Sequence, residues 1–525
     1  MEALFWATPM LILFTGLLWI FRPSARQHLL LISVLASAVA LSASFLGLWQ
    51  AVIAGFCGLL STAVLFTFWK RVGHGRGVVQ SIIGATCIML GVLTLFINIS
   101  APLSHLPSPT GPFFVGTSDF VVVDRTRSGM KGVGGSEPRK LLIRAYYPAD
   151  NVFPYQAKAY FSRLEAKQVT RGENRLGELG FLNSHLRHIA THTYDHAPIV
   201  TGQKFPIIVF SNGFSSHIGS TTILLSELAS NGYVVFSLSH PGDMSAVVYP
   251  DKSSVTITGK VVEGLGKPNV NRGLETQEAS PQQDHVFFEN LWRDTEQFNW
   301  VRHAPAFLHE SHSIWVKDTQ VFLKRLRSGD LPDSKVNLLA NTDPTHIVLA
   351  GTSFGGSVAV SVCHIDSVCR AAVNIDGSNF DSSLVNNTVR MPTLSLQHDF
   401  SVHPNMATMR SFGMRNPIDT SYEKNISVGD TGLVTRVELR GMLHQSFSDS
   451  TWFSRGALAR KLIKTGNLSP QHSVSLVSNI LVTYIDSHLK ETVKFSEIFN
   501  ELPNANLYTP AALQKWAVER QNQIY

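Results

Sequence analysis

The stretch Thr345–Gly356, with the sequence THIVLAGTSFGG, decides how the rest of the chain is interpreted. A short apolar run ends at Gly351 and leads into the pattern Gly-x-Ser-x-Gly, centred on Ser353. Between a strand and a helix, this pattern predicts a tight turn that holds a serine hydroxyl above a sheet. Glycine on either side removes side chains that would collide with the neighbouring backbone. Ser353 is therefore a candidate nucleophile, with the N–H of Phe354 beside it at a helix N-terminus that favours negative charge.

The first hundred residues differ in composition from the rest of the chain. Only 16% of the 525 residues are charged, and the net charge is a modest +6. The chain has no dense Lys/Arg run with interleaved aromatic residues, which argues against nucleic-acid binding. Each apolar run of the N-terminal part is long enough to cross a hydrocarbon core as a helix. These runs are Ala3–Phe21, Leu29–Trp49, Ala51–Trp69 and Val79–Ile97, and they predict a four-helix transmembrane region over residues 1–100.

Basic residues predict the orientation of this region. They lie between the first two runs and between the last two, whereas the middle link carries no charge; they are Arg22, Arg26, Lys70, Arg71 and Arg76. By the positive-inside rule both basic loops are cytoplasmic, and an even number of crossings then puts both termini outside. We expect an integral protein of the cell or inner membrane, with its C-terminal domain on the extracytoplasmic side.

The chain has four cysteines. Cys57 and Cys87 fall in the apolar N-terminal runs, where packing roles are expected. Cys363 and Cys369 lie six residues apart beside the predicted turn, a spacing that is not a zinc pattern by itself. In an oxidising compartment this pair is able to form a disulfide, and two buried free thiols are the alternative.

Residues 101–116 are rich in proline and predict a linker. Beyond it, short continuous apolar runs typical of buried parallel strands alternate with helical stretches; the runs include Phe205–Phe210, Tyr233–Leu238, Ala371–Ile375 and Thr393–Leu396. This alternation predicts an α/β domain with a parallel sheet over residues 117–490. Residues 239–313 form a polar stretch with aromatic residues, either a lid over an acyl pocket or a surface insertion. Residues 491–525 are expected to form a C-terminal helical tail.

A serine hydroxyl becomes a good nucleophile only when a base removes its proton and an acid orients that base. His444 is the candidate base, because it lies in a turn after the apolar stretch Val434–Leu439 and can reach back over the serine. Two carboxylates at the carboxyl ends of consecutive predicted strands are candidate acids, Asp376 and Asp399. Spacing alone does not choose between them, and Asp381, further into a loop, is a weaker third option.

Four stretches carry a family resemblance. They are Pro206–Phe214 (PIIVFSNGF), Leu228–Val235 with Ser239–Asp243 (LASNGYVV and SHPGD), Gly351–Gly356 (GTSFGG), and Leu443–Asp449 (LHQSFSD). Together they resemble the platelet-activating-factor acetylhydrolases of the plasma and intracellular type II kind, which are α/β-hydrolases. The last stretch is similar to the family's His-Gln-x-Phe-x-Asp segment and is more specific than the serine pattern itself. The resemblance implies an α/β-hydrolase fold.

The resemblance also implies roles for particular residues. In that family the acid follows the strand directly after the serine turn, which favours Asp376 over Asp399. The backbone N–H groups of Phe214 and Phe354 would form the oxyanion hole. Two features depart from the family pattern: Asn212 stands where the family usually has histidine, and this chain adds membrane spans.

These observations predict a membrane-anchored serine esterase that hydrolyses a carboxylic ester, a lipid or phospholipid ester with a short acyl group, through an acyl-serine intermediate. An acyltransferase would use the same residues with an alcohol in place of water. A non-catalytic, membrane-tethered sensor domain is the alternative from a different class. The predicted chemistry requires neither a metal nor an organic cofactor. The expected partners are the lipid or other apolar ester and the membrane, without nucleic acid or an obligate protein partner.

Overall fold

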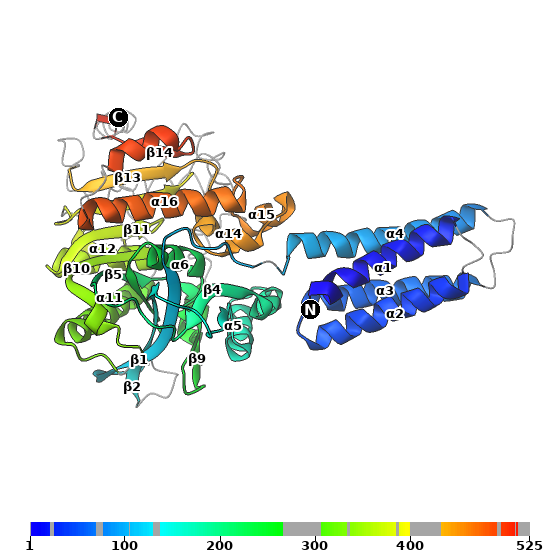
Figure 1. Ribbon diagram of the computed structural model, residues 1–525, viewed down its shortest axis with the longest axis horizontal. Coiled ribbons are helices and arrows are strands. Elements are labelled where there is room, and N and C mark those ends of the chain that lie inside the picture. Colours follow the sequence, from blue (N-terminus) through cyan, green and yellow to red (C-terminus); the bar gives the residue numbers. More distant parts are fainter. Residues whose placement is uncertain are drawn as a thin grey trace.

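The structure is a computed structural model that describes residues 2–21, 26–69, 77–103, 105–129, 137–265, 306–332, 336–384, 388–399, 432–490, 495–509 and 511–512. A bundle of four N-terminal helices projects from an α/β domain (Figure 1). The helices are α1 (Glu2–Phe21), α2 (Arg26–Phe45), α3 (Trp49–Trp69) and α4 (Gly77–Ser100). Large apolar side chains cover the outside of the bundle, with Phe45 90%, Phe56 73% and Phe66 66% exposed. A surface of this kind suits a hydrocarbon environment.

Three of these helices, α2, α3 and α4, are long and apolar enough to cross a membrane, judged by length and composition. The apolar part of α1 is shorter and runs from Phe5 to Phe21. At about 1.5 Å per residue it falls short of a hydrocarbon core of about 30 Å. Pro9 also lies inside this helix. The predicted count of four membrane-spanning helices is therefore corrected to three candidate spans and one shorter apolar helix.

The 3₁₀ segment η2 (Gly180–His188) of the α/β domain holds the loop between α2 and α3. The indole Nε1 of Trp49 donates to the carbonyl of Leu182 at 3.0 Å, and Nε2 of His188 donates to the carbonyl of Leu46 at 2.6 Å. This loop is the uncharged link of the N-terminal region. Because α2 runs away from it, Arg26, the first residue of α2, lies at the far end of the bundle.

The α/β domain contains an eleven-stranded sheet in the order β14-β13-β12-β11-β10-β5-β7-β2-β1-β4-β3. The strands are β1 (Phe114–Ser128), β2 (Pro138–Ala149), β3 (Ala157–Ala159), β4 (Ala190–Asp195), β5 (Phe205–Ser211), β7 (Val234–Leu238), β10 (Thr342–Thr352), β11 (Cys369–Ile375), β12 (Thr393–His398), β13 (Val434–Leu439) and β14 (Ala505–Tyr508). From β7 to β13 all neighbouring strands are parallel. Their carboxyl ends therefore share one edge, where the predicted site residues follow β5, β10, β11 and β13.

Helices cover both faces of the sheet (Figure 1). One face is covered by α6 (Thr222–Ser230) and α16 (Pro470–Leu489), and the other by α11 (Ala306–Ser328) and α12 (Phe354–Ile365). Further helices of the domain are α5 (Arg163–Arg175), α14 (Ser450–Phe453) and α15 (Ala457–Ile463). Alternate residues of β10 serve two cores, because successive side chains of a strand point to opposite faces. Leu349 packs in the core that contains α11 and α12, whereas Val348 packs in the core that contains α6 and α16. This layering is the predicted α/β architecture.

The segment 239–313 contains regular structure on both sides of residues 266–305, which lie outside the described residues. A small second sheet joins β6 (Ser215–His217), β8 (Met244–Val248) and β9 (Ser254–Thr256), and α7 (Gly259–Leu265) follows it. The helix predicted to start at Ile314 begins at Ala306, so the expected insertion ends inside a core helix. The aromatic residues proposed as a lid lie among residues 266–305, so that hypothesis stays a prediction.

The C-terminal tail differs from the prediction of a helix. Its described part contains the 3₁₀ segment η8 (Phe495–Glu501) and the strand β14, which pairs antiparallel with β13. Leu507 of this strand pairs with Val437. A strand of four residues is too short to show an alternating pattern in the sequence, and its position depends on the free edge of β13.

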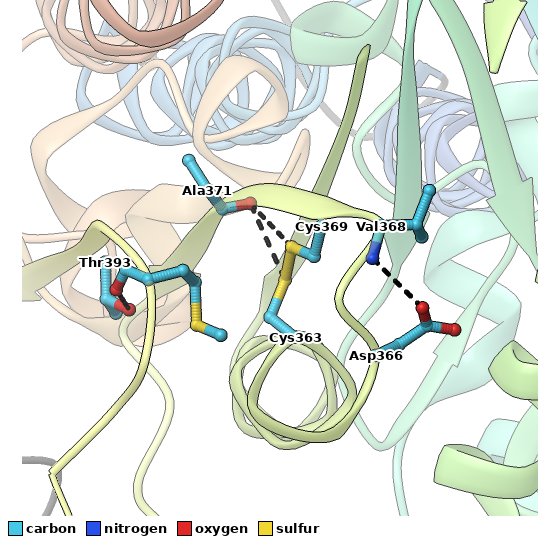
Figure 2. The surroundings of a disulfide bond; sticks show 7 residues. Cys363, Asp366, Val368, Cys369, Ala371 and Thr393 are labelled. Atoms are coloured by element: carbon cyan, nitrogen blue, oxygen red, sulfur yellow. Dashed lines mark hydrogen bonds between the residues drawn. A yellow bond between two sulfur atoms is a disulfide. The ribbon is translucent and has the colours of Figure 1, made fainter. Parts of the chain in front are cut away.

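Cys363 at the end of α12 and Cys369 at the start of β11 form a disulfide, with 5.2 Å between their Cα atoms (Figure 2). Asp366 shapes the turn between them by accepting a hydrogen bond from the N–H of Val368 at 3.1 Å. The disulfide ties the helix that follows Ser353 to the strand that precedes Asp376. Of the two alternatives left open by the sequence, the structure has the disulfide. Cys57 and Cys87 are free and buried in the helical bundle.

Candidate active site

Ser353 lies at the tight turn between β10 and α12. Its backbone has φ 52° and ψ −124°, a conformation that non-glycine residues rarely adopt and that persists only when the surroundings impose it. The N–H of Ser353 donates to the carbonyl of Ile375 at 2.7 Å, which joins the turn to the end of β11. A Cβ added at Gly355 would lie 2.1 Å from the carbonyl oxygen of Ser211, so this position accepts only glycine. The turn and the reason for its glycine are as the sequence predicts.

Asp376, which follows the end of β11 beside this turn, contacts His444. Asp376 follows β11 with φ 58°, and His444 opens the 3₁₀ segment η7 (His444–Phe447) after β13. Nδ1 of His444 lies 2.6 Å from Oδ2 of Asp376. A carboxylate only accepts, so Nδ1 carries the proton and Nε2 presents its lone pair. The Asp376 side chain is 4% exposed and that of His444 is 47% exposed, so the acid is buried and the base is open to a substrate.

The local electrostatics favour an ionised acid and a basic imidazole. Burial alone would raise the pKa of the Asp376 carboxyl, but the imidazoles of His398 and His444 outweigh burial and hold that pKa well below its usual range. Desolvation alone would lower the pKa of His444, but the hydrogen bond and charge of Asp376 outweigh it, and the pKa of His444 is raised. His444 is therefore a stronger base than an isolated histidine.

His398 is a site residue that the sequence analysis missed. It ends β12, and its Nδ1 lies 2.8 Å from Oδ1 of Asp376, while its backbone N–H donates to the same oxygen at 2.9 Å. The sequence signal for it is its place at the end of the strand beside β11, directly before the candidate acid Asp399. Asp376, His398 and His444 also present ligand atoms within 4.8 Å of one another. Among the residues that the structure describes, this group has the geometry to hold a metal ion.

The other two candidate acids lie elsewhere. Asp399 is buried, and its Oδ2 accepts from the backbone N–H of Gly441 at 2.8 Å. This bond supports the loop that leads to His444. Asp381 accepts from the backbone N–H and the hydroxyl of Ser383, at 2.9 and 2.6 Å. The structure thus brings Asp376 to His444, whereas Asp399 binds the loop that leads to His444 and Asp381 binds a residue of its own loop.

The loop after β5 passes directly beside Ser353. A Cβ added at Gly213 would lie 3.2 Å from Cβ of Ser353. The rings of Phe214 and Phe354 contact each other edge to face, with centroids 5.1 Å apart. Within the described residues neither backbone N–H of these two phenylalanines has a hydrogen-bond partner. Two unsatisfied donors beside a serine are what an oxyanion hole requires.

Asn212, which departs from the family pattern, is buried and holds this loop through hydrogen bonds. Its Nδ2 donates to the carbonyl of Ile218 at 3.2 Å. Its Oδ1 accepts from the hydroxyls of Ser220 and Thr221, at 2.9 and 2.7 Å. With both ends of the amide bound, Asn212 fixes the course of the loop rather than pointing into the site.

Comparison with known proteins assigns the chain to a family. The sequence profile described as platelet-activating factor acetylhydrolase, isoform II, matches residues 98–260 and 333–506, more than half of the chain. The chain belongs to this family. Among its relatives, the platelet-activating factor acetylhydrolase of Gallus gallus is 21% identical over 402 residues, covering 73% of this chain and 84% of that protein. The one of Bos taurus is 21% identical over 444 residues, covering 80% and 88%.

A solved structure is similar in fold. The ferulic acid esterase from Streptomyces cinnamoneus superposes with a TM-score of 0.54 at 19% sequence identity, covering 78% of this chain and 100% of that chain. The predicted α/β-hydrolase fold and the family resemblance are confirmed, and membership makes the chain a serine ester hydrolase. The helix α11 lies between the two segments that the profile matches.

Proposed function

We propose that Ser353, His444 and Asp376 hydrolyse a carboxylic ester of a lipid through an acyl-serine intermediate at the outer surface of a membrane. The observation that carries this proposal is the 2.6 Å hydrogen bond between Nδ1 of His444 and Oδ2 of the buried Asp376. It directs the lone pair of an exposed imidazole away from the acid, at the sheet edge where Ser353 lies. This is the arrangement of a general base with its orienting acid.

In the first half of the reaction, Nε2 of His444 takes the proton from Oγ of Ser353, which attacks the ester carbonyl. The negative charge that develops on the carbonyl oxygen is bound by the N–H groups of Phe214 and Phe354. Removing one such donor typically costs about 3 kcal/mol of barrier. His444 then gives its proton to the departing alcohol, and the acyl group stays on Ser353.

In the second half, His444 removes a proton from water, and the resulting hydroxide attacks the acyl-serine. The tetrahedral intermediate collapses, the acid is released, and Ser353 recovers its proton from His444. Throughout, Asp376 stays ionised and stabilises the imidazolium, in agreement with the low pKa that its two histidine neighbours impose. The chain's own residues supply every proton transfer in this scheme.

The proposed substrate is a lipid ester with a short acyl group. Family membership supports a lipid ester, since the Gallus gallus and Bos taurus relatives are named for platelet-activating factor. The apolar bundle supports a substrate that resides in or beside a membrane. Preference for long acyl chains in a series of esters with one head group would contradict this part of the proposal.

The proposed location of the domain is extracytoplasmic. The uncharged α2–α3 loop lies against η2, and the helix ends that flank the two basic links lie at the opposite end of the bundle. The positive-inside rule places that opposite end in the cytoplasm. The disulfide between Cys363 and Cys369 supports the same side, because such bonds persist in oxidising compartments.

The test uses the full chain in native membranes, with a fluorophosphonate probe and a chain-length series of model esters. The wild type should be labelled and should hydrolyse short esters, and Ser353→Ala should do neither. Ser328→Ala, at the exposed end of α11, is the matched control and should behave as wild type. Turnover by Ser353→Ala would overturn the mechanism, and an unlabelled wild type would favour a non-catalytic sensor. Adding an acceptor alcohol and analysing the products separates hydrolysis from acyl transfer.

A further inference from the structure

A second hydrogen-bonded series of serine, histidine and aspartate lies inside the domain, at the start of the loop that carries Phe214. Oγ of Ser211 is 3.0 Å from Nε2 of His240, and Nδ1 of His240 is 2.9 Å from Oδ2 of Asp318. His240 and Asp318 are fully buried, and Ser211 is 4% exposed. These distances match those of a catalytic triad, but the side chains offer a substrate no access. Their role must therefore be a structural one, exerted on what they hold.

Two arginines bind the carboxylate of Asp318, at the inner end of this hydrogen-bonded series. Arg139 binds both carboxylate oxygens of Asp318, at 2.7 and 2.6 Å, and Arg127 binds one of them at 2.8 Å. Burial opposes ionisation, but the charge and hydrogen bonds of Arg139, together with His240, outweigh it and hold the pKa of Asp318 well below its usual range. An ionised Asp318 only accepts, so His240 donates from Nδ1. Burial lowers the pKa of His240 and keeps its ring neutral, so Nε2 accepts the O–H of Ser211. The direction of every bond is thus determined.

The outer end of this hydrogen-bonded series, Ser211, is also the end of β5. Ser211 is the last residue of that strand, and the loop that carries Phe214 begins directly after it. Its carbonyl oxygen sits where a side chain on Gly355 would lie, against the serine turn. A shift of Ser211 would therefore move the Phe214 loop and the Ser353 turn relative to each other.

Trp315 of α11 contacts the part of the same loop that includes and follows Phe214. Its ring stacks on His240, with centroids 3.9 Å apart and an angle of 10°, and lies nearly parallel to Phe214 at 6.1 Å. Its Nε1 donates to Oδ2 of Asp243 at 2.8 Å. The backbone carbonyl of Asp243 in turn accepts from the N–H of Ser215 at 2.9 Å. Residues on both sides of Phe214 are therefore tied to one helix.

We propose that α11 sets the oxyanion hole, with Asp318 and Trp315 as positioning residues. Asp318 acts through His240 and Ser211, and Trp315 acts through Asp243 and the Phe214 ring. Together they keep the N–H of Phe214 aligned with that of Phe354. The inference rests on the proposed function. Because α11 lies between the segments that the family profile matches, this support is supplied by a part of the chain outside the matched sequence.

The test is Trp315→Phe, which keeps a stacking ring and removes the N–H that binds Asp243. Misalignment of one oxyanion donor should lower kcat about tenfold to a hundredfold. KM should change little, since the ground-state ester makes little use of that donor. The affinity for a trifluoromethyl ketone, whose adduct with the serine carries the oxyanion, should fall by the same factor as kcat.

Two further variants make the result decisive. Ser211→Ala removes the outer end of the buried hydrogen-bonded series with little change in volume, and it should show the same pattern. Phe322→Leu is the matched control, because Phe322 lies fully buried on the same helix but packs on Phe236, with centroids 5.2 Å apart. This control should lower the melting temperature and leave kcat per folded molecule unchanged.

The outcomes separate this inference from the proposed function. If the wild type is labelled by fluorophosphonate, but Trp315→Phe and Ser211→Ala both retain its kcat and ketone affinity, the inference is overturned. It is equally overturned if their losses only track the folded fraction, as for Phe322→Leu. If Trp315→Phe does not fold, Ser211→Ala decides by the same measurements. An unlabelled, inactive wild type would instead remove the proposed function and the inference with it.

Discussion

The carboxylate of Asp376 is shared between two imidazoles, and this sharing controls how basic His444 becomes. His398 approaches both carboxylate oxygens through Nδ1, at 2.8 and 2.9 Å, while His444 binds Oδ2. Each donor draws on the same negative charge. A change at His398 should therefore be detected at His444, although the two rings contact each other only edge to face, with centroids 6.4 Å apart.

His398→Phe should move the acid limb of the kcat/KM profile to higher pH. Without the second donor, more of the Asp376 charge stabilises the imidazolium, so the pKa of His444 rises further above its ordinary value. The reaction needs neutral His444, and activity is lost as pH falls through that pKa. The measurement is the pH dependence of ester hydrolysis. His346→Phe, a histidine bound to Asp343 on the surface at 2.8 Å, is the control and should leave the limb in place.

Asp376→Asn should lower kcat by a factor on the order of 10⁴, because the amide no longer enforces the tautomer that His444 needs. Asp399→Asn is the matched comparison. Its amide oxygen can still accept from the N–H of Gly441, so the loss should stay below about tenfold. Steady-state kinetics on both variants provide the measurement. Equal losses from the two substitutions would contradict the assignment of the acid.

At this scale the sequence predicted the candidate nucleophile, base and acid but not their neighbours. Ser353 and His444 lie in local patterns, and the structure brings Asp376 rather than Asp399 to His444. His398 and Asp318 lie in no pattern of their own. Their partners are far away in the chain, 22 residues for His398 and 78 for the contact of Asp318 with His240. Only the sheet order and the packing of α11 bring these groups together.

The helix that follows Ser353, α12, is anchored by the disulfide between Cys363 and Cys369. The disulfide closes the turn between α12 and β11, and Asp366 orders the same turn. Since α12 begins at Phe354, whose N–H is a proposed oxyanion donor, the tie anchors the helix at the end away from the chemistry.

Replacing Cys363 and Cys369 together by serine should lower the free energy of unfolding by about 2 kcal/mol, the value expected for a short closed loop. Denaturant unfolding of the detergent-solubilised full chain, followed by loss of fluorophosphonate labelling, measures this. A reductant should shift the wild type by a similar amount and leave the double variant unchanged. An unchanged midpoint for the variant would show that the disulfide does not stabilise the domain.

Elements with long, regular patterns were predictable, and those set by their surroundings were not. The strands of the parallel sheet are continuous apolar runs, so Phe205–Ser211 and Cys369–Ile375 appear close to their predicted bounds. β14 has only four residues and depends on an open sheet edge. The first apolar helix resembles a membrane span in composition, and its shorter apolar length distinguishes it from the other three.

At the scale of the whole molecule, the proposed topology predicts which surface meets the outside. Two variants each carry one reporter cysteine. Gln203→Cys places it in the exposed loop before β5, and Ser24→Cys places it in the basic link that precedes α2 in the sequence. In intact cells, with Cys57 and Cys87 replaced by alanine, a membrane-impermeant maleimide should label the first and not the second. Permeabilised cells, in which both should react, are the control. Labelling of Ser24→Cys alone would reverse the proposed orientation.

If the helical bundle spans a membrane as proposed, the contact between η2 and the α2–α3 loop has a consequence for how the enzyme reaches its substrate. Bonds from Trp49 and His188 fasten the domain to its own helices instead of leaving it on a free tether. An enzyme held in this way in a bilayer searches in two dimensions. Its rate should then follow the mole fraction of ester in its own membrane, and diluting that ester with inert lipid should slow it even when the total amount of ester is unchanged.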